Sequence, residues 1–276
     1  MKFAGLINPS LYRIACCVLF STSLAATAQA QSTAFSVDNL PNIASIGVGI
    51  APDYVGSDDD TVVAGPSGRL TFDNHRYIKL VGPTVTSNLI DHDIFRLGPA
   101  LNYRFGRSDV DDQVVNLMED IDGTVELGLN AGLHFTNALN PRYQFAVNLE
   151  VFYDVGGEHE DIVSNLSVSY WRPLVKAFTV GMVAGTQYGG DDFANNYFGV
   201  SAVDSARSGL PRFIAEGGFN DVSLSLIGVL HLGPTWHIGG GVHYQYLMDE
   251  IADSPIVATR GSRDQLIAGI GLAYAW

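Results

Sequence analysis

Seven histidines are the side chains of this chain best suited to metal binding. His231, His237 and His243 share one parity on neighbouring predicted strands, so their side chains point to the same side of a sheet. Zinc needs three or four ligands at about 2.0–2.1 Å, whereas six residues of strand place His237 roughly 20 Å from His243. We therefore predict no metal site and interpret these histidines as polar residues of the protein wall.

Three acidic clusters, at residues 58–60, 109–112 and 119–122, carry carboxylates dense enough to bind calcium or magnesium. None of them has the D-x-[DN]-x-[DN]-G spacing that wraps a loop around a calcium ion. We interpret the clusters as solvated loops, and we expect neither a metal nor any other cofactor.

Nucleophilic catalysis has little support in the sequence. The chain has no G-x-S-x-G motif. Asp204, Ser205 and Ser208 lie in one long predicted loop that contains no histidine, so a pairing with His159 of a neighbouring connection would have to cross between loops. We expect no enzymatic activity and assign no catalytic residue.

Six charged residues stand inside stretches that alternate between polar and apolar positions. If the apolar parity of each stretch faces lipid, the other parity faces an enclosed lumen that contains Arg69, Arg96, Arg104, Glu126, Glu150 and Asp154. A buried charge must be paired or solvated. A water-filled channel would solvate these charges and a plugged lumen would pair them across strands, and the sequence leaves both arrangements open.

The C-terminal stretch shows most clearly which elements position these residues. In residues 266–276 one parity is apolar and mostly large up to the terminal Trp276, and the other parity holds only Ile267, glycines and alanines. Side chains alternate across a strand. An apolar outer face over small inner residues is typical of a strand that stands in lipid and closes a barrel.

The same alternation returns along the chain from Ile43 onward, which predicts an all-β protein. The runs are as long as a tilted membrane strand of roughly 9–11 residues, and longer than the usual soluble strand of roughly 5–6. Aromatic residues collect at their ends, as expected at a membrane interface. A secreted soluble sandwich is the alternative, but these features favour a closed antiparallel transmembrane β-barrel.

The connections between the predicted strands alternate between short and long. The short ones are 73–75, 172–174 and 233–235. The long ones are roughly 107–121, 188–212 and 249–263. Bacterial barrels have an even number of strands, short periplasmic turns and longer external loops. The stretch 75–92 must then hold two short strands, so we predict about twelve strands, with ten as the fallback.

The N-terminus has the pattern of a secretory signal peptide. Lys2 and Arg13 precede an apolar run over residues 14–26, and Ala28-Gln29-Ala30 is a cleavage site, so we predict a signal peptide over 1–30 and one barrel domain over 31–276. The apolar run is shorter than the roughly 20 residues of a transmembrane helix. The sequence therefore predicts export to the bacterial outer membrane.

The charge balance limits the partners. Removing the signal takes two of the 15 Lys and Arg and none of the 29 Asp and Glu, which leaves a formal charge of −16. Such an acidic chain is unsuited to nucleic acid and to a polybasic surface on anionic lipid. The predicted surroundings are the lipid of the outer membrane.

Several stretches resemble the MipA/OmpV family of outer-membrane proteins. They are residues 49–60 (GIAPDYVGSDDD), 95–112 (FRLGPALNYRFGRSDVDD), 120–128 (DIDGTVELG), 197–211 (YFGVSAVDSARSGLP) and 253–271 (DSPIVATRGSRDQLIAGIG). The resemblance implies an outer-membrane barrel without known catalytic residues. One branch of the family is named for interaction with a lytic murein transglycosylase, as a scaffold that brings it to a murein synthase. Another branch is linked to adhesion and to osmotic or antibiotic response.

Three functions follow as alternatives. The leading one is a non-enzymatic envelope scaffold for a murein hydrolase or synthase. The second is a small channel or solute-uptake barrel that uses the charged lumen, and the third is an adhesin that acts through the external loops. No motif marks a scaffold surface, so the sequence assigns no binding residue.

Overall fold

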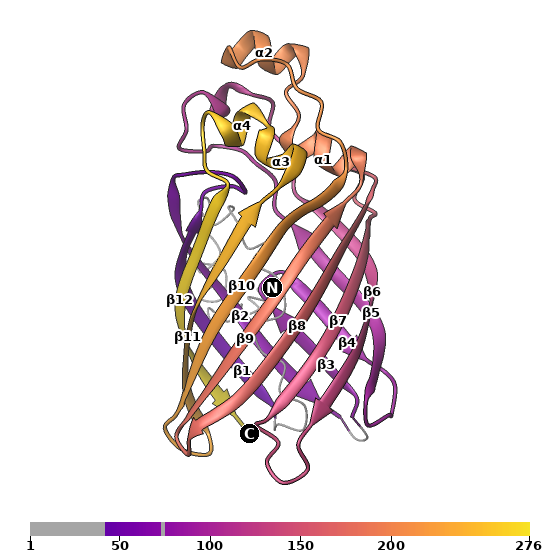
Figure 1. Cartoon of the computed structure of the whole chain (residues 1–276), viewed down its shortest axis with the longest axis vertical. Coiled ribbons are helices and arrows are strands. Elements are labelled where there is room, and N and C mark those ends of the chain that lie inside the picture. The colour runs from indigo at the N-terminus through magenta and orange to yellow at the C-terminus, as the bar shows by residue number, and fades with distance from the viewer. Residues whose placement is uncertain (1–41, 73–74) are drawn as a thin grey trace, which may run out of the picture.

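The computed structural model describes residues 42–72 and 75–276 and is a closed barrel of twelve antiparallel strands. Every strand pairs with its neighbours in sequence, and β1 closes the barrel on β12 (Figure 1). The strands are β1 (Ile43–Pro52), β2 (Asp60–Thr71), β3 (Tyr77–Val81), β4 (Thr84–Asn88), β5 (Phe95–Arg104), β6 (Thr124–Thr136), β7 (Gln144–Asp154), β8 (Ile162–Val175), β9 (Phe178–Gly189), β10 (Gly218–His231), β11 (Trp236–Leu247) and β12 (Asp264–Ala275). The predicted fold class and strand number are confirmed, including two short strands within 75–92. The predicted signal peptide lies outside the described residues.

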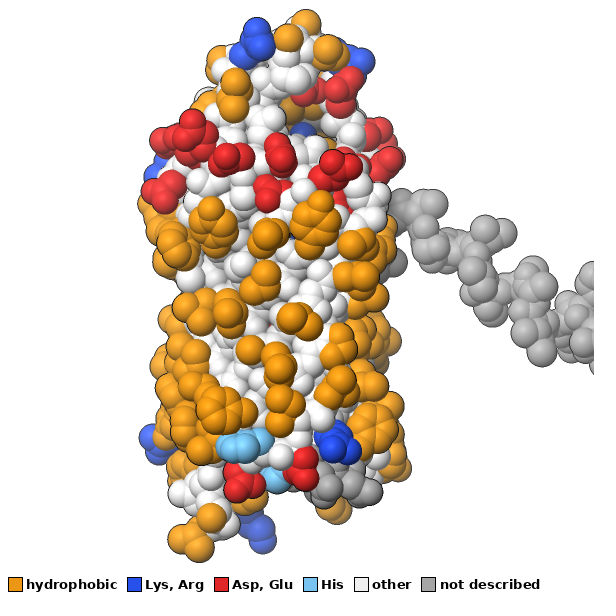
Figure 2. All heavy atoms as spheres, turned by 90° about the vertical axis from the view of Figure 1, so that its right-hand side faces the viewer, with side chains coloured by type: hydrophobic (Ala, Val, Ile, Leu, Met, Phe, Trp, Pro, Cys, Tyr) orange, Lys and Arg blue, Asp and Glu red, His pale blue; other side chains and the backbone are white. Residues whose placement is uncertain are grey.

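The apolar parity of the strands faces outward. Ile46, Leu129 and Ile270 are 67%, 60% and 59% exposed, while the alternate positions of the same strands are less exposed or lack a side chain. In Figure 2 hydrophobic side chains cover the height of the strands and acidic side chains form a band above them. This distribution suits a barrel surrounded by hydrocarbon. None of the helices in the described residues has the length and apolar character needed to cross a membrane.

Except for the turn 82–83 between the short strands β3 and β4, the connections fall into two groups at opposite ends of the barrel. The turn end, where the C-terminus lies, holds the short connections 72–76, 89–94, 137–143, 176–177 and 232–235. The loop end holds the connections 53–59, 105–123, 155–161, 190–217 and 248–263. By the rule for bacterial barrels, the turn end faces the periplasm.

One predicted turn is wrong. Residues 172–174 lie inside β8, and the chain reverses at Lys176 and Ala177 instead. Pro173 is tolerated because the pairing of β8 with β9 shifts register between Pro173 and Val175, and a bulge is one of the few places where a strand accepts proline.

The long loops fold together into a cap over the loop end (Figure 1). Its helical segments are η2 (Val115–Leu117), α1 (Asp191–Phe198), α2 (Ala202–Ser208), α3 (Asp249–Asp253) and α4 (Pro255–Ala258). Two buried apolar clusters hold the cap together, one around Phe193, Leu247 and Ile251 and one around Val115 and Ile256. The cap therefore has a hydrophobic core of its own, above a barrel most of whose large apolar residues point outward.

Candidate functional site

The six predicted lumen charges are all buried, each with at most 6% of its surface exposed. They occupy different heights of the barrel. Arg104, Glu126 and Asp154 lie near the loop end, Arg69 and Arg96 lie near the turn end, and Glu150 lies within β7. The charges therefore do not form one continuous polar lining, and the loop-end group has the densest contacts.

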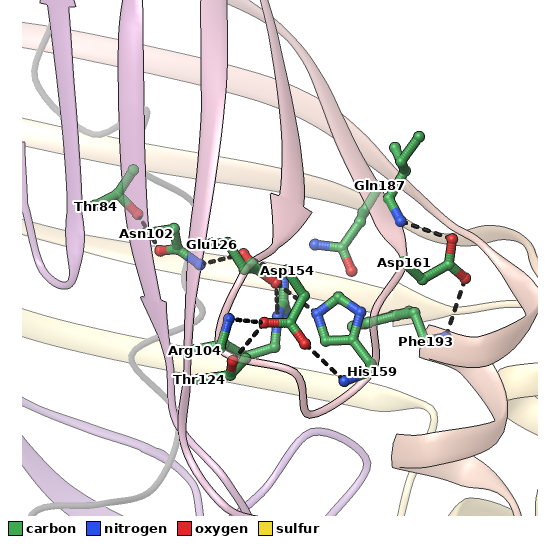
Figure 3. Close-up of polar contacts among 12 residues, drawn as sticks. Thr84, Asn102, Arg104, Thr124, Glu126, Asp154, His159, Asp161, Gln187 and Phe193 are labelled. Atoms are coloured by element: carbon green, nitrogen blue, oxygen red, sulfur yellow. Dashed lines mark hydrogen bonds and ion pairs between the residues drawn. The ribbon is translucent and has the colours of Figure 1, made fainter.

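Glu126 is the centre of the loop-end group (Figure 3). Its carboxylate accepts hydrogen bonds from Arg104 Nε at 2.5 Å and Nη2 at 3.2 Å, and from Asn102 Nδ2 at 2.7 Å. His159 Nε2 lies 3.0 Å from Glu126 Oε1. Glu126 and the side chain of His159 are completely buried. A buried carboxylate that is paired with a guanidinium and further hydrogen-bonded is a packed structural group rather than the solvated wall of a channel.

Asp154 shapes the loop 155–161 beside this pair. Its carboxylate accepts hydrogen bonds from the backbone N–H groups of His159 at 2.7 Å, Gly156 at 2.9 Å and Glu160 at 3.0 Å, and from the hydroxyl of Thr124. A single buried side chain thus holds the loop in a form that points His159 back toward Glu126 (Figure 3).

The same loop also fixes helix α1. Asp161 accepts hydrogen bonds from the backbone N–H groups of Asp192 at 3.0 Å and Phe193 at 3.2 Å, which the first turn of a helix leaves unpaired. The Phe193 ring then lies 4.8 Å from the Arg104 guanidinium and 5.3 Å from the His159 ring. The loop-end charges therefore attach the barrel wall to the cap.

The interpretation of all three acidic clusters as solvated loops is wrong at Asp112, which is buried. Asp112 accepts hydrogen bonds from Arg260 Nε at 3.0 Å and Nη2 at 2.5 Å, across 148 residues of sequence. Burial raises the pKa of Asp112, but hydrogen bonds from Arg260, Val115 and Val114 outweigh that effect and hold the pKa below its ordinary value. The pair joins loop 105–123 to loop 248–263 within the cap.

At other titratable groups of the cap, burial is the largest effect on the pKa and disfavours the charged form. It raises the pKa of Asp53 and of the Tyr54 phenol, and it lowers the pKa of the Arg107 guanidinium. Arg107 donates a hydrogen bond from Nη1 to the carbonyl of Tyr197 at 2.9 Å. These directions agree with the burial of the apolar clusters inside the cap.

The turn-end half of the lumen is different. A cavity of about 550 Å³ lies there, and its lining includes Arg69, His231 and His237. Arg69 lies over the Tyr77 ring at 4.0 Å, and Arg96 donates hydrogen bonds to backbone carbonyls of the turn 89–94. His231 Nδ1 lies 3.1 Å from His237 Nδ1, while His243 contacts Ser225 at 2.8 Å. Within residues 42–72 and 75–276, no group of three or more His, Cys, Asp or Glu has a metal-binding arrangement.

The sequence does not reveal the role of several residues of this site. A cross-loop pairing of His159 with the serines of loop 188–212 is not formed, because Ser205 Oγ donates to the carbonyl of Leu210 and His159 contacts Glu126. Asp161 and Arg260 had no assigned role. Their hydrogen-bond partners are 31 and 148 residues away in the sequence, so no local pattern predicts these contacts.

The outward apolar surface, the even number of antiparallel strands and the buried polar groups together define an outer-membrane β-barrel. Residues 44–276 match the family described as MltA-interacting protein MipA, and the chain belongs to this family. The predicted resemblance and the outer-membrane location are thereby confirmed. A comparison with curated proteins finds no match.

Solved structures of similar architecture are outer-membrane barrels. The NanC porin has 11% sequence identity and a TM-score of 0.46, with 85% of this chain and 100% of that chain covered. An outer membrane channel from Pseudomonas putida F1 has 10% identity and a TM-score of 0.47, with 87% and 98% covered. The KdgM porin has 9% identity and a TM-score of 0.37, with 84% and 99% covered.

Proposed function

We propose that this protein is a non-enzymatic interaction protein of the outer membrane that holds a murein hydrolase or synthase at the periplasmic face. The name of the matched family refers to such a partner. The packed cap is the observation that favours this proposal over a channel, because a pore needs a continuous aqueous path and the loop end is filled by buried apolar clusters. What remains accessible from the periplasm is the turn end.

The turn 137–143 is the longest connection among the described residues of that end, and it offers a contact surface. It presents Leu139, which is 96% exposed. Asn137 Oδ1 accepts hydrogen bonds from the backbone N–H groups of Leu139 at 2.9 Å and Asn140 at 3.1 Å, and Arg142 Nη1 donates to the carbonyl of Lys176 at 2.7 Å. An apolar side chain on an ordered turn loses little conformational entropy when a partner buries it.

Co-purification from solubilised envelopes tests the proposal. We expect a murein hydrolase or synthase to accompany the tagged protein, and Leu139→Asp to reduce its recovery at least tenfold, since burying a leucine contributes about 1.5–3 kcal/mol. The matched control is Ile214→Asp, because Ile214 is 75% exposed but lies at the loop end. It should leave recovery unchanged.

Two results would contradict the proposal. If no murein enzyme accompanies the protein under conditions that retain other envelope complexes, the scaffold function is wrong. If the refolded protein gives stepwise conductance in planar bilayers, the cap is not a seal and the channel alternative becomes the better account.

A further inference from the structure

The cavity at the turn end is bounded on one side by bare backbone. Gly65, Gly47, Gly271 and Gly239 are successive pairing partners across β2, β1, β12 and β11. The pair Gly49 and Gly269 begins a second such row, which continues to Gly241. Glycine in a strand often marks a place where a ligand approaches the backbone closely. Here the glycines explain why about 550 Å³ of the lumen is unfilled by side chains.

The facing side of the cavity is apolar. Trp171, Ile227 and Val229 line it, and the first two belong to a buried cluster with Val183. The hydroxyl and imidazole groups of the lining contact one another, as in the pairs Ser45–Ser67, Ser225–His243 and Thr179–His231. The cavity therefore suits a hydrocarbon chain better than a polar solute. The volume lies within the range of roughly 300–1,000 Å³ that is usual for ligand pockets.

The charged residues of the lining all have one sign. Arg69, Lys79 and Arg142 line the cavity, together with three histidines, and the described residues of the lining include no Asp or Glu. Arg69 and Lys79 are direct cross-strand partners on β2 and β3, and both are buried. Arg69 also contacts the Tyr77 ring, and cationic side chains in the described lining favour an anionic ligand over a cationic one.

The barrel wall beside the cavity is incomplete. β3 and β4 have five residues each, whereas β2 and β5 have 12 and 10. Residues 62–66 of β2 consequently pair with β1 on one edge and with no described strand on the other. Above the turn at Gly82, the missing parts of two strands separate β2 from β5 by roughly 14 Å.

This side opening meets the cavity. Residues 63–66, at the unpaired edge of β2, line the cavity without a break, as do Val81 and Gly82 at the end of the short hairpin. An unpaired strand edge at membrane depth is costly unless it is buried in protein or borders a cavity. The opening thus connects the apolar lumen with the hydrocarbon around the barrel.

We infer that the cavity binds one anionic phospholipid, which enters from the membrane through the opening between β2 and β5. Its acyl chain lies between the glycine rows and Trp171. Its phosphate lies toward the turn end, where Arg69 and Lys79 lie side by side. The inference is independent of the scaffold function.

Trp171 provides a direct test, because the chain has three tryptophans and the other two, Trp236 and Trp276, are on the outer surface. In the Trp236→Phe/Trp276→Phe background, Trp171 fluorescence is measured in phosphatidylcholine vesicles that contain phosphatidylglycerol with brominated acyl chains. We expect several-fold more quenching than from the same fraction of brominated phosphatidylcholine. Equal quenching by the two lipids would overturn the inference.

Filling the cavity separates lumenal lipid from lipid outside the barrel. Gly65 lines the cavity, and a Cβ added there meets no atom within 4 Å, so Gly65→Phe begins in open space and adds a ring beside the cavity. We expect it to remove the excess quenching. Gly218→Phe is the matched control, since Gly218 is also open at its Cβ position but does not line the cavity. If brominated phosphatidylglycerol quenches Trp171 equally in both variants, the lipid is not in the cavity.

The charge is tested by Lys79→Gln, with Lys176→Gln as the control, because Lys176 lies at the turn end but does not line the cavity. Only Lys79→Gln should reduce the preference for phosphatidylglycerol. An excess of soluble glycerol phosphate should leave the quenching unchanged; full displacement would assign the site to free phosphate and reject the lipid. Circular dichroism of each variant verifies that the barrel is folded.

Discussion

The two halves of the lumen differ in what their inward side chains do. At the loop end, Arg104, Glu126 and His159 fill the space and bind a cap with its own apolar core. At the turn end, glycines such as Gly47 and Gly271 leave a cavity. The strands and their alternation are the same in both halves. The alternation thus decides which side chains face inward, while their size and charge decide whether the lumen is closed or hollow.

The largest expected effect comes from breaking the loop-end ion pair. Glu126→Gln leaves the Arg104 guanidinium buried without its carboxylate, which should reduce the free energy of unfolding by about 3–5 kcal/mol. Urea unfolding of the protein refolded in lipid vesicles measures this loss of free energy. The control is Glu119→Gln, since the Glu119–Arg207 pair is more than half exposed on both sides and should change stability by less than about 1 kcal/mol. Equal losses would mean that Glu126 is not a structural centre.

The next effect should be confined to the cap. Ile256 is fully buried in the second apolar cluster, so Ile256→Ala should cost about 2–5 kcal/mol. Because the cap is separate from the strand pairing, we expect faster hydrogen exchange in loops 105–123 and 190–217 and unchanged exchange in β7 and β8. Uniformly faster exchange across the strands would show that the two halves unfold as one unit.

Two glycines of the hollow half should respond differently to the same substitution. At Gly49 an added Cβ would lie 2.4 Å from the carbonyl oxygen of Ala268, whereas at Gly65 it meets nothing within 4 Å. Gly49→Ala should therefore reduce stability by about 1–3 kcal/mol, and Gly65→Ala should be neutral or stabilising by up to about 1 kcal/mol. The stabilities of the two variants are compared by thermal unfolding in detergent. A similar loss in both would mean that the turn-end wall is packed rather than open.

The smallest effect concerns pH. Because the pKa of Asp112 is held below its ordinary value of 3.8, the pair with Arg260 stabilises the cap fully above that value and loses its contribution as the pH falls through the lower, folded-state pKa. Hydrogen exchange of residues 248–263 in the wild type and in Asp112→Asn measures this. The variant should exchange faster at pH 7, and the difference should shrink once the pH falls below 3.8, the ordinary pKa of the carboxyl. A constant difference at all pH values would exclude the titration of Asp112 as its cause.

The outward side chains can be predicted from the sequence, because hydrophobic alternation with a period of two depends on no distant partner. The sequence therefore predicted the barrel, about twelve strands, the two short strands within 75–92 and the inward position of charges such as Glu126. It missed the extension of β8 past Pro173, because a bulge depends on the register with β9.

The tertiary structure alone decided whether the inward charges are paired or solvated, and whether the loops are open or packed. Asp112 meets Arg260, and Glu126 meets both Arg104 and His159, across 22 to 148 residues of chain. Such contacts depend on how loops pack in space, which no local pattern encodes. The side opening beside the turn-end cavity has the same origin: short strands are visible in the sequence, but the gap they leave exists only once the barrel has closed around them.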